Sequence, residues 1–414
     1  MAESKNQHYV PRHYLRRFSL ADGKRILIYV IESNFFPAAA PIKTQCSEDY
    51  FYSKDTQFEK LLTKLEGRAE TLFSAMCETD SLPQDKLTQR DILAVLGVMY
   101  GRTRLSVEQR DSLFDQAVKA TMRKDPEFEA ITSISKEDLG KFKISDPYSA
   151  QKAVVQGLLT GYRIGDLSVK ILKAETNRRF ITSDHPVAVV NQAFARLLPK
   201  ANTCGLSMRG IQLFLPLDPA RCLVAFDPNA YRIGKPSRDC VKLTREDDVE
   251  LINSLQVQNA DRHLYFQAEG DRDHVRHLIN RYGKFRGRVG GFARTIDPAP
   301  DGETAPSFVV FEMPQVKIPA PWSFCHVRKG LSQGFGLRDP ELNLQLDAYY
   351  RDILEKERLV PFHVWQSEQR MLRRLVKSPG LSRTPQRPQV IESGQRHHRR
   401  RSLAHGDREP ETSF

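Results

Sequence analysis

The sequence lacks the short motifs by which several large enzyme classes are recognised. It contains no P-loop, no GxGxxG, no HExxH and no GxSxG, which disfavours NTPases, Rossmann oxidoreductases, zinc peptidases and typical serine hydrolases. No apolar run approaches the roughly 18 residues of a membrane span, and no secretory leader pattern is present. These absences lead us to expect a cytoplasmic protein with no membrane association.

Cysteine is sparse, and its spacing excludes the common zinc sites. No two of the six cysteines form a CxxC pair, and no cysteine and histidine group has zinc-ligand spacing. Without a secretory signal, we expect reduced thiols. The cysteines are Cys46, Cys77, Cys204, Cys222, Cys240 and Cys325.

Basic residues outnumber acidic ones. The chain has 63 Lys and Arg against 51 Asp and Glu, a net charge of +12 over 414 residues. A basic protein attracts anions, and nucleic acid is the commonest large one. Solubility explains the same excess equally well, so charge alone leaves both interpretations open.

The hydrophobic pattern predicts an α+β fold, because helices and strands are segregated along the chain and do not alternate strictly. We expect a helical N-terminal half packed with a small mixed or antiparallel sheet, a short C-terminal extension and a disordered tail. Three- and four-residue apolar spacing predicts helices, at 58–76, 88–99 with Thr88 as N-cap, 106–118, 146–173 with glycine breaks at Gly161 and Gly165, and 244–257. β-branched and apolar runs predict strands, at 25–31, 179–182, 211–215, 222–226, 264–266 and 308–311.

Composition also predicts four successive regions. Residues 1–295 form the main domain and residues 296–306 a Pro-rich linker. Residues 307–377 form a small C-terminal extension, and residues 378–414 form a basic tail with few large apolar residues. Such a composition is typical of disorder.

The opening stretch, Gln7 to Phe18, packs three aromatic, two His and three Arg side chains around one proline. Disordered leaders are poor in aromatic residues. We therefore expect this stretch to belong to the folded protein and to carry polar groups that other residues satisfy.

Four blocks of the sequence together resemble the HYVP-motif family, a mainly bacterial family of uncharacterised proteins. The first is Gln7–Phe18, the second begins at Glu48 and includes Leu65-Glu66, the third runs from Arg102-Thr103 to Arg110, and the fourth is Phe180–Val187 with the turn at 216–219. The blocks span about residues 6–266. One departure is Arg104, where relatives usually carry proline. The resemblance implies no reaction.

Two motifs carry residues suited to catalysis. His8 and His185 could transfer protons near neutral pH, and Asp184 could hold Mg²⁺ through oxygen. The alternatives are structural: a buried His8 bonded to a backbone carbonyl, and Asp184 closing an Asx-type turn before Pro186.

Other residues could complete a metal or phosphate site. Glu59 and Glu66 lie two helical turns apart on one face and could join Asp184 as metal ligands, or they could be solvated acids. Arg12 and Arg102 could bind phosphate through their planar guanidinium groups. A divalent cation such as magnesium is the cofactor that this arrangement would need; the sequence determines neither the metal nor the oligomeric state.

The segment 274–294 carries six basic residues and no acid, interleaved with aromatic residues. Basic groups neutralise phosphates and aromatic rings stack on unpaired bases; a flexible basic loop is the alternative. The candidate contacts to phosphate are Arg281, Lys284, Arg286 and Arg288.

Two functional hypotheses remain open. The first is metal-assisted phosphodiester hydrolysis of nucleic acid or another phosphate-bearing polymer, with Asp184 and a glutamate as metal ligands. The second is a non-catalytic module that binds nucleic acid or a partner protein, in which the HYVP and SDHP segments are structural turns. Convergence of His8, Asp184 and an acid of the second block would separate them.

Overall fold

The computed structural model describes residues 5–54, 56–198, 203–286, 292–296, 308–312, 316–331, 334–356, 360 and 362–377. It divides into two compact units, residues 1–348 and residues 349–414. The predicted linker beyond Ile296 and the predicted tail lie outside the described residues. The predicted domain boundaries stay predictions.

A five-stranded mixed sheet holds the first unit together. Its order is β11-β5-β9-β8-β7, with β11 parallel to β5 and the other pairs antiparallel. Its strands are β5 (Ser168–Ala174), β7 (Ala188–Val190), β8 (Gln212–Asp218), β9 (Arg221–Phe226) and β11 (Cys240–Leu243).

A second sheet is antiparallel, in the order β3-β2-β12-β6. Its strands are β2 (Arg25–Val30), β3 (Ala40–Pro41), β6 (Thr182–Ser183) and β12 (His263–Phe266). Three further antiparallel ladders pair β1 (Asn6–His8) with β4 (Ser47–Asp49), β10 (Tyr231–Ile233) with β15 (Cys325–Val327), and β13 (Phe292–Ile296) with β14 (Phe308–Glu312).

Helices surround these sheets, and the α+β class with a mixed sheet is confirmed. The α-helices are α1 (Arg12–Arg16), α2 (Thr56–Thr79), α3 (Lys86–Gly101), α4 (Arg104–Lys124), α5 (Phe128–Thr132), α6 (Ser149–Arg163), α7 (Gln192–Leu197), α8 (Glu246–Asn259), α9 (Arg272–Tyr282), α10 (Pro340–Lys356) and α11 (Phe362–Lys377). The 3-10 turns are η1 (Ile42–Thr44), η2 (Asp138–Lys141), η3 (Glu269–Asp271) and η4 (Gly283–Phe285).

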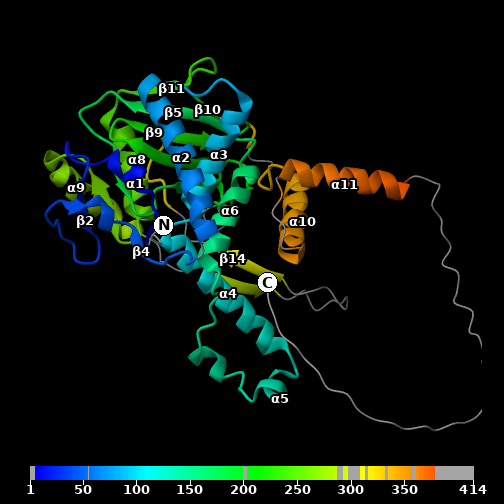
Figure 1. The fold of residues 1–414 in the computed structure, drawn as a ribbon. Coiled ribbons are helices and arrows are strands. Elements are labelled where there is room, and N and C mark those ends of the chain that lie inside the picture. Colours follow the sequence, from blue (N-terminus) through cyan, green and yellow to red (C-terminus); the bar gives the residue numbers. More distant parts are fainter. Residues whose placement is uncertain are drawn as a thin grey trace, which may run out of the picture. The chain divides into compact units, whose positions relative to one another are not determined.

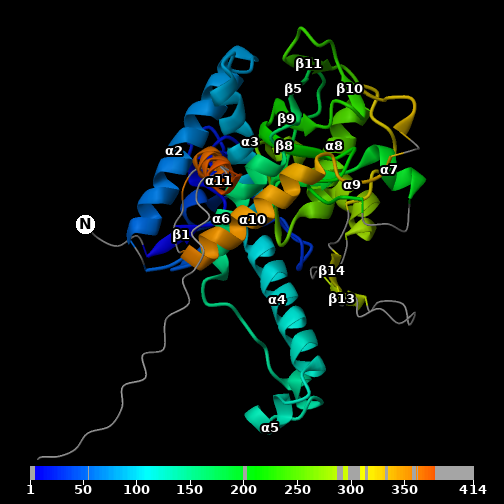
Figure 2. The same cartoon turned by 90° about the vertical axis from the view of Figure 1, so that its right-hand side faces the viewer.

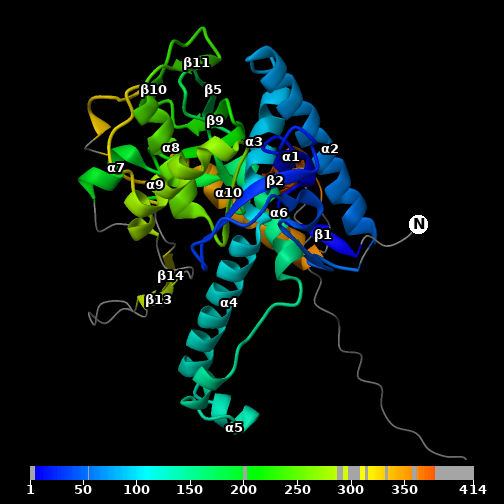
Figure 3. The same cartoon turned by 90° about the vertical axis from the view of Figure 1, so that its left-hand side faces the viewer.

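The two faces of the five-stranded sheet are covered by different helices, as Figures 2 and 3 show. Alternate residues of a strand point to opposite faces. Leu213 and Leu215 accordingly share an apolar cluster with residues of α2, α3 and α6, whereas Phe214 shares one with α8. Trp322, from beyond β14, joins the second cluster with its ring 4.9 Å from that of Phe214.

Helices α3 and α6 cross at glycines, and this crossing positions the residues just after α3. A Cβ at Gly157 would lie 2.8 Å from the Val98 Cα, and one at Gly161 would lie 2.6 Å from the Ala94 Cα. The two backbones therefore touch where any side chain would separate them. Arg102 and Thr103 come directly after the end of α3, so the close contact of the two helices helps to place them.

Two predictions of helix ends are wrong. The predicted helix at 146–173 ends at Arg163, and β5 begins at Ser168, where the β-branched Val169 and Ile171 favour a strand. The predicted N-cap Thr88 lies one turn inside α3. The cap is Asp85, whose carboxylate accepts the Thr88 N–H at 2.8 Å.

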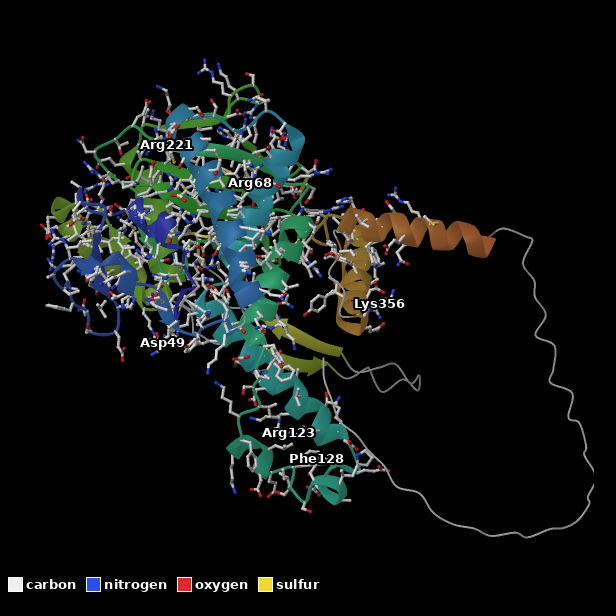
Figure 4. The ribbon with its side chains drawn as sticks, viewed as in Figure 1. Asp49, Arg68, Arg123, Phe128, Arg221 and Lys356 are labelled. Atoms are coloured by element: carbon white, nitrogen blue, oxygen red, sulfur yellow. The ribbon has the colours of Figure 1, made fainter. Side chains whose placement is uncertain are left out.

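Away from the sheets, α4 runs outward to α5 (Figure 1), and Figure 4 labels Arg123 and Phe128 in this region. In the second unit, Tyr349, Phe362 and Trp365 form an aromatic cluster, with ring centroids 5.1–5.8 Å apart. Within the described residues, no helix has the length and apolar character needed to cross a membrane.

Candidate functional site

Buried polar contacts join the four sequence blocks at one place, which we call the junction. Gln7 begins it, because its amide pairs with the backbone of the second block. Its Nε2 donates to the Ser53 carbonyl at 2.6 Å, and its Oε1 accepts the Tyr52 N–H at 2.7 Å. The first two blocks are thereby fixed to each other.

Arg102 joins the third block to both. Its guanidinium donates to the His8 carbonyl at 2.6 Å, to Glu66 Oε1 at 2.7 Å and to the Tyr52 hydroxyl at 3.0 Å. The residue is only 2% exposed. Arg102, predicted to bind phosphate, therefore directs its donors at three groups of the protein itself.

Tyr14 joins the first block to the fourth. Its hydroxyl lies 2.6 Å from Thr182 Oγ1 and donates to the Pro216 carbonyl at 2.8 Å. The ring is fully buried and packs edge-on against Phe73 of α2. One aromatic side chain thus links α1, β6 and β8.

His185 joins the fourth block to the third. Its Nδ1 lies 2.6 Å from the Thr103 hydroxyl, and its ring centroid is 5.9 Å from that of Tyr100. Burial lowers the pKa of His185 to about 4, so the imidazole is neutral at pH 7. The close hydroxyl and the burial together favour a structural role for this imidazole over proton transfer to a substrate.

Asp184 holds a segment far away along the chain. Its Oδ1 accepts the Asp261 N–H at 2.8 Å, and its Oδ2 accepts those of Arg262 and His263 at 2.7 and 3.0 Å. Burial raises the pKa of Asp184 to about 7, while the N–H donors of Asp261 and His263 oppose that rise. The carboxylate thus anchors the start of β12, and the turn before Pro186 is closed by Ser183, whose Oγ accepts the His185 N–H.

Three amide side chains of α8 clasp the backbone of residues 179–187, which include the SDHP segment, and sequence reasoning missed them. Asn253 pairs with the backbone at Arg179 and Ile181, Gln256 donates to the Pro186 carbonyl, and Asn259 donates to the carbonyls of His185 and Val187. Their spacing of three residues, among the apolar residues Leu251, Ile252, Leu255 and Val257, was a readable signal. Amides buried in such a face must find partners within the fold.

The His8 carbonyl accepts a hydrogen bond from Arg102, whereas the imidazole of the same residue has other neighbours. Burial, followed by the charges of Arg12 and Arg102, lowers the pKa of His8 to about 4, while the backbone at Ile42 and Lys43 opposes the fall. Its Nε2 has no hydrogen-bond partner within the described residues.

Tyr9 lies in the field of Asp184: burial raises the pKa of Tyr9, and the Cys46 and Asp184 charges add to the rise.

The three predicted metal ligands engage different partners. Asp184 binds backbone N–H groups, Glu66 pairs with Arg102, and Glu59 has a pKa raised by burial and then by Glu66. Across the part of the chain that the structure describes, no group of three or more His, Cys, Asp or Glu side chains is placed to hold a metal ion.

The predicted phosphate contacts are scattered. Arg12 is exposed on α1, Arg281 pairs with Glu250 at 3.1 Å, and Arg286 donates to the carbonyls of Val257 and Asp261. Lys284 is exposed, with its Nζ 5.3 Å from the Phe285 ring centroid. Arg288 lies outside the described residues.

A family model for proteins of unknown function, DUF4238, matches residues 6–270. The chain belongs to DUF4238. No curated protein and no solved structure matches it. The DUF4238 match contains all four blocks and the clasping helix α8, so the whole junction lies within the family domain. The predicted contacts at Arg281–Arg288 lie beyond it.

Proposed function

We propose that this DUF4238 protein is a non-catalytic module that binds a phosphate-bearing polymer, nucleic acid, and that its HYVP and SDHP segments are structural. The observation that carries the proposal is the Asp184 carboxylate. Both of its oxygens accept backbone N–H groups, three in all. A metal ion would have to share a buried carboxylate that already accepts three backbone N–H groups and fixes β12 to the fourth block.

Cations on and near α9 support the choice of ligand. Arg276 and Arg272 place their guanidinium groups 5.1 and 5.5 Å from the Phe36 ring centroid. Lys284 and Lys317 flank Phe285 in the same way. Basic side chains beside aromatic rings are the combination by which proteins bind the backbone and stack the bases of single strands.

The test is a titration of the full chain against a fluorescent oligonucleotide, single- and double-stranded, across a salt series. Replacing Arg276, Arg281 and Lys284 by Ala should weaken binding and reduce the slope of log K against log salt by about 2–3, because three phosphate contacts release their counterions. The control replaces Lys60, Lys64 and Arg123 by Ala, the same loss of charge on α2 and α4.

Three outcomes would contradict the proposal: no binding, binding independent of salt, or equal loss in the control. Cleavage of the oligonucleotide that EDTA abolishes and Asp184→Asn removes would support the hydrolase hypothesis in its place.

A further inference from the structure

A hollow of about 540 Å³ lies beside the loop that joins β10 to β11. Its walls come from the first turns of α3, the start of β5, the end of β9 and β10. Figures 1 and 3 show β5, β10 and β11 together at one end of the first unit. The volume falls within the roughly 300–1,000 Å³ that is usual for small-ligand sites.

Three arginines from three separate segments line this hollow: Arg90 of α3, Arg232 of β10 and Arg328, just after β15. All three are exposed, and within the described residues none of them pairs with a carboxylate. The Nε of Arg328 donates to the Pro228 carbonyl at 2.8 Å, which fixes its position and leaves the terminal nitrogens of the guanidinium free to meet a ligand. The hollow therefore gathers positive charge on several of its walls.

A fourth cation, Lys170, is built into the wall. It is 8% exposed, and its Nζ donates to the carbonyls of Lys235, Pro236 and Arg238 at 3.3, 3.2 and 2.5 Å. These carbonyls belong to the β10–β11 loop, so the ammonium holds the loop in place. Buried positive charge beside a hollow raises the local concentration of anions.

Acidic groups do not cancel this charge. Asp239 is the one acid among the described residues of the lining, and its Oδ2 accepts the Leu82 N–H at 3.2 Å. Four basic side chains thus face one carboxylate that already has a partner.

The rest of the lining is apolar. Leu93, Leu167, Phe226, Tyr231 and Ile233 are buried residues that contribute to it. The Tyr231 hydroxyl donates to the Gly210 carbonyl, so the polar end of the tyrosine already has a partner within the fold. A ligand that fits this lining has an apolar or aromatic part next to its negative charge.

A second hollow of about 450 Å³ lies on the other side of the same loop. Arg232, Gly234 and Pro236 line both, and the second adds Lys235, Lys242 and His326. Arg232 therefore stands between two hollows that both carry basic side chains.

We propose that these hollows bind a phosphoryl group attached to an apolar or aromatic moiety, as a nucleoside monophosphate presents it. The arginines hold the phosphate and the apolar lining accepts the base. This inference goes beyond polymer binding at α9, because it concerns another surface and needs no polymer. A free nucleotide and the phosphorylated 5′ end of a strand offer the same chemistry.

The experiment is calorimetric titration of the full chain at low salt with AMP, inorganic phosphate and adenosine. AMP should bind more tightly than either part. The double variant Arg90→Gln/Arg232→Gln should weaken AMP binding about tenfold or more, because charge-assisted hydrogen bonds are lost. The matched control is Arg238→Gln, an exposed arginine of the same loop whose side chain lines neither hollow, and it should bind AMP like the parent.

Failure of AMP to bind, equal affinity for AMP and phosphate, or equal weakening in the control would overturn the inference. Unchanged melting temperatures of the variants show that they are folded.

Short strands with and without a 5′ phosphate separate the two sources of the phosphoryl group. Tighter binding of the phosphorylated strand than of AMP assigns a strand end, and the reverse assigns a free nucleotide. An oligonucleotide with a blocked 5′ end tests polymer binding at α9 alone. If the double variant still binds this oligonucleotide, its loss of AMP binding is distinguished from a failure of the polymer proposal.

Discussion

Both oxygens of the Asp184 carboxylate face N–H groups of a segment 77 to 79 residues further along the chain. A buried carboxylate that accepts three hydrogen bonds has its orientation fixed by those bonds, and its charge strengthens them. At the scale of the residue, this makes Asp184 a tether between two strands of the antiparallel sheet, β6 and β12.

We predict that Asp184→Asn destabilises the protein by about 1–3 kcal/mol, because the new amide N–H₂ must face a backbone N–H and leaves it unsatisfied. Chemical denaturation measures the change. Asp49→Asn is the control, since Asp49 forms an exposed pair with Lys5 at 2.9 Å and exposed pairs contribute little. An unchanged midpoint for Asp184→Asn would mean that the tether does not stabilise the fold.

The residues of the junction show what sequence can and cannot predict. The HYVP and SDHP segments stand out because they place polar groups among apolar ones. Their partners do not: neither the backbone at 261–263 nor the amides of α8 can be assigned to Asp184 or His185 by local pattern. Such contacts depend on the fold bringing distant segments together.

At the scale of the element, the crossing of α3 and α6 rests on two glycine pairs with the same spacing, Gly97 and Gly101 on one helix and Gly157 and Gly161 on the other. The sequence pattern predicts a break at Gly161, whereas the structure places this glycine inside α6, facing Ala94. The four-residue spacing of these glycines is visible in the sequence. Its role in helix packing can be inferred only once the two helices are known to meet.

We predict that Gly157→Ala lowers the free energy of unfolding by about 1–3 kcal/mol, because the added methyl meets the backbone of Val98 and must push the helices apart. Gly67→Ala on α2 is the control: a Cβ there meets nothing within 4 Å, and alanine favours a helix by about 0.5–1 kcal/mol. Equal effects of the two substitutions would contradict a close crossing.

At the scale of the whole molecule, buried titratable groups make stability depend on pH. Burial is the main cause that lowers the pKa of five described histidines, to about 4 for His8, His185 and His274, to about 3 for His13, and below its ordinary value for His263. Their unfolded pKa is about 6.5. As the pH falls from about 6.5 towards 4, these histidines therefore bind protons in the unfolded chain and stay neutral in the folded chain. Burial raises the pKa of Asp184 and Asp261, to about 7 and about 6, which acts in the opposite direction.

These histidines outweigh the two aspartates, so we predict that stability falls as pH drops from about 6.5 to about 4, by about 1 kcal/mol or more per pH unit. Thermal melts across this range measure it. His13→Phe, which removes one titrating group from a position beside Phe73, should make the dependence shallower. Stability that is constant or rises towards pH 4 would show that the aspartates dominate.

The pairing of β10 with β15 has a consequence for how this family domain could exist in shorter proteins. The family match ends at residue 270, yet Cys325–Val327 supplies the strand that covers β10, and Trp322 covers Phe214. A chain cut at the end of the match would keep the junction intact but expose a bare strand edge and an apolar surface, both of which promote aggregation. The unit recognised by the family model is therefore shorter than the unit that covers β10 and Phe214.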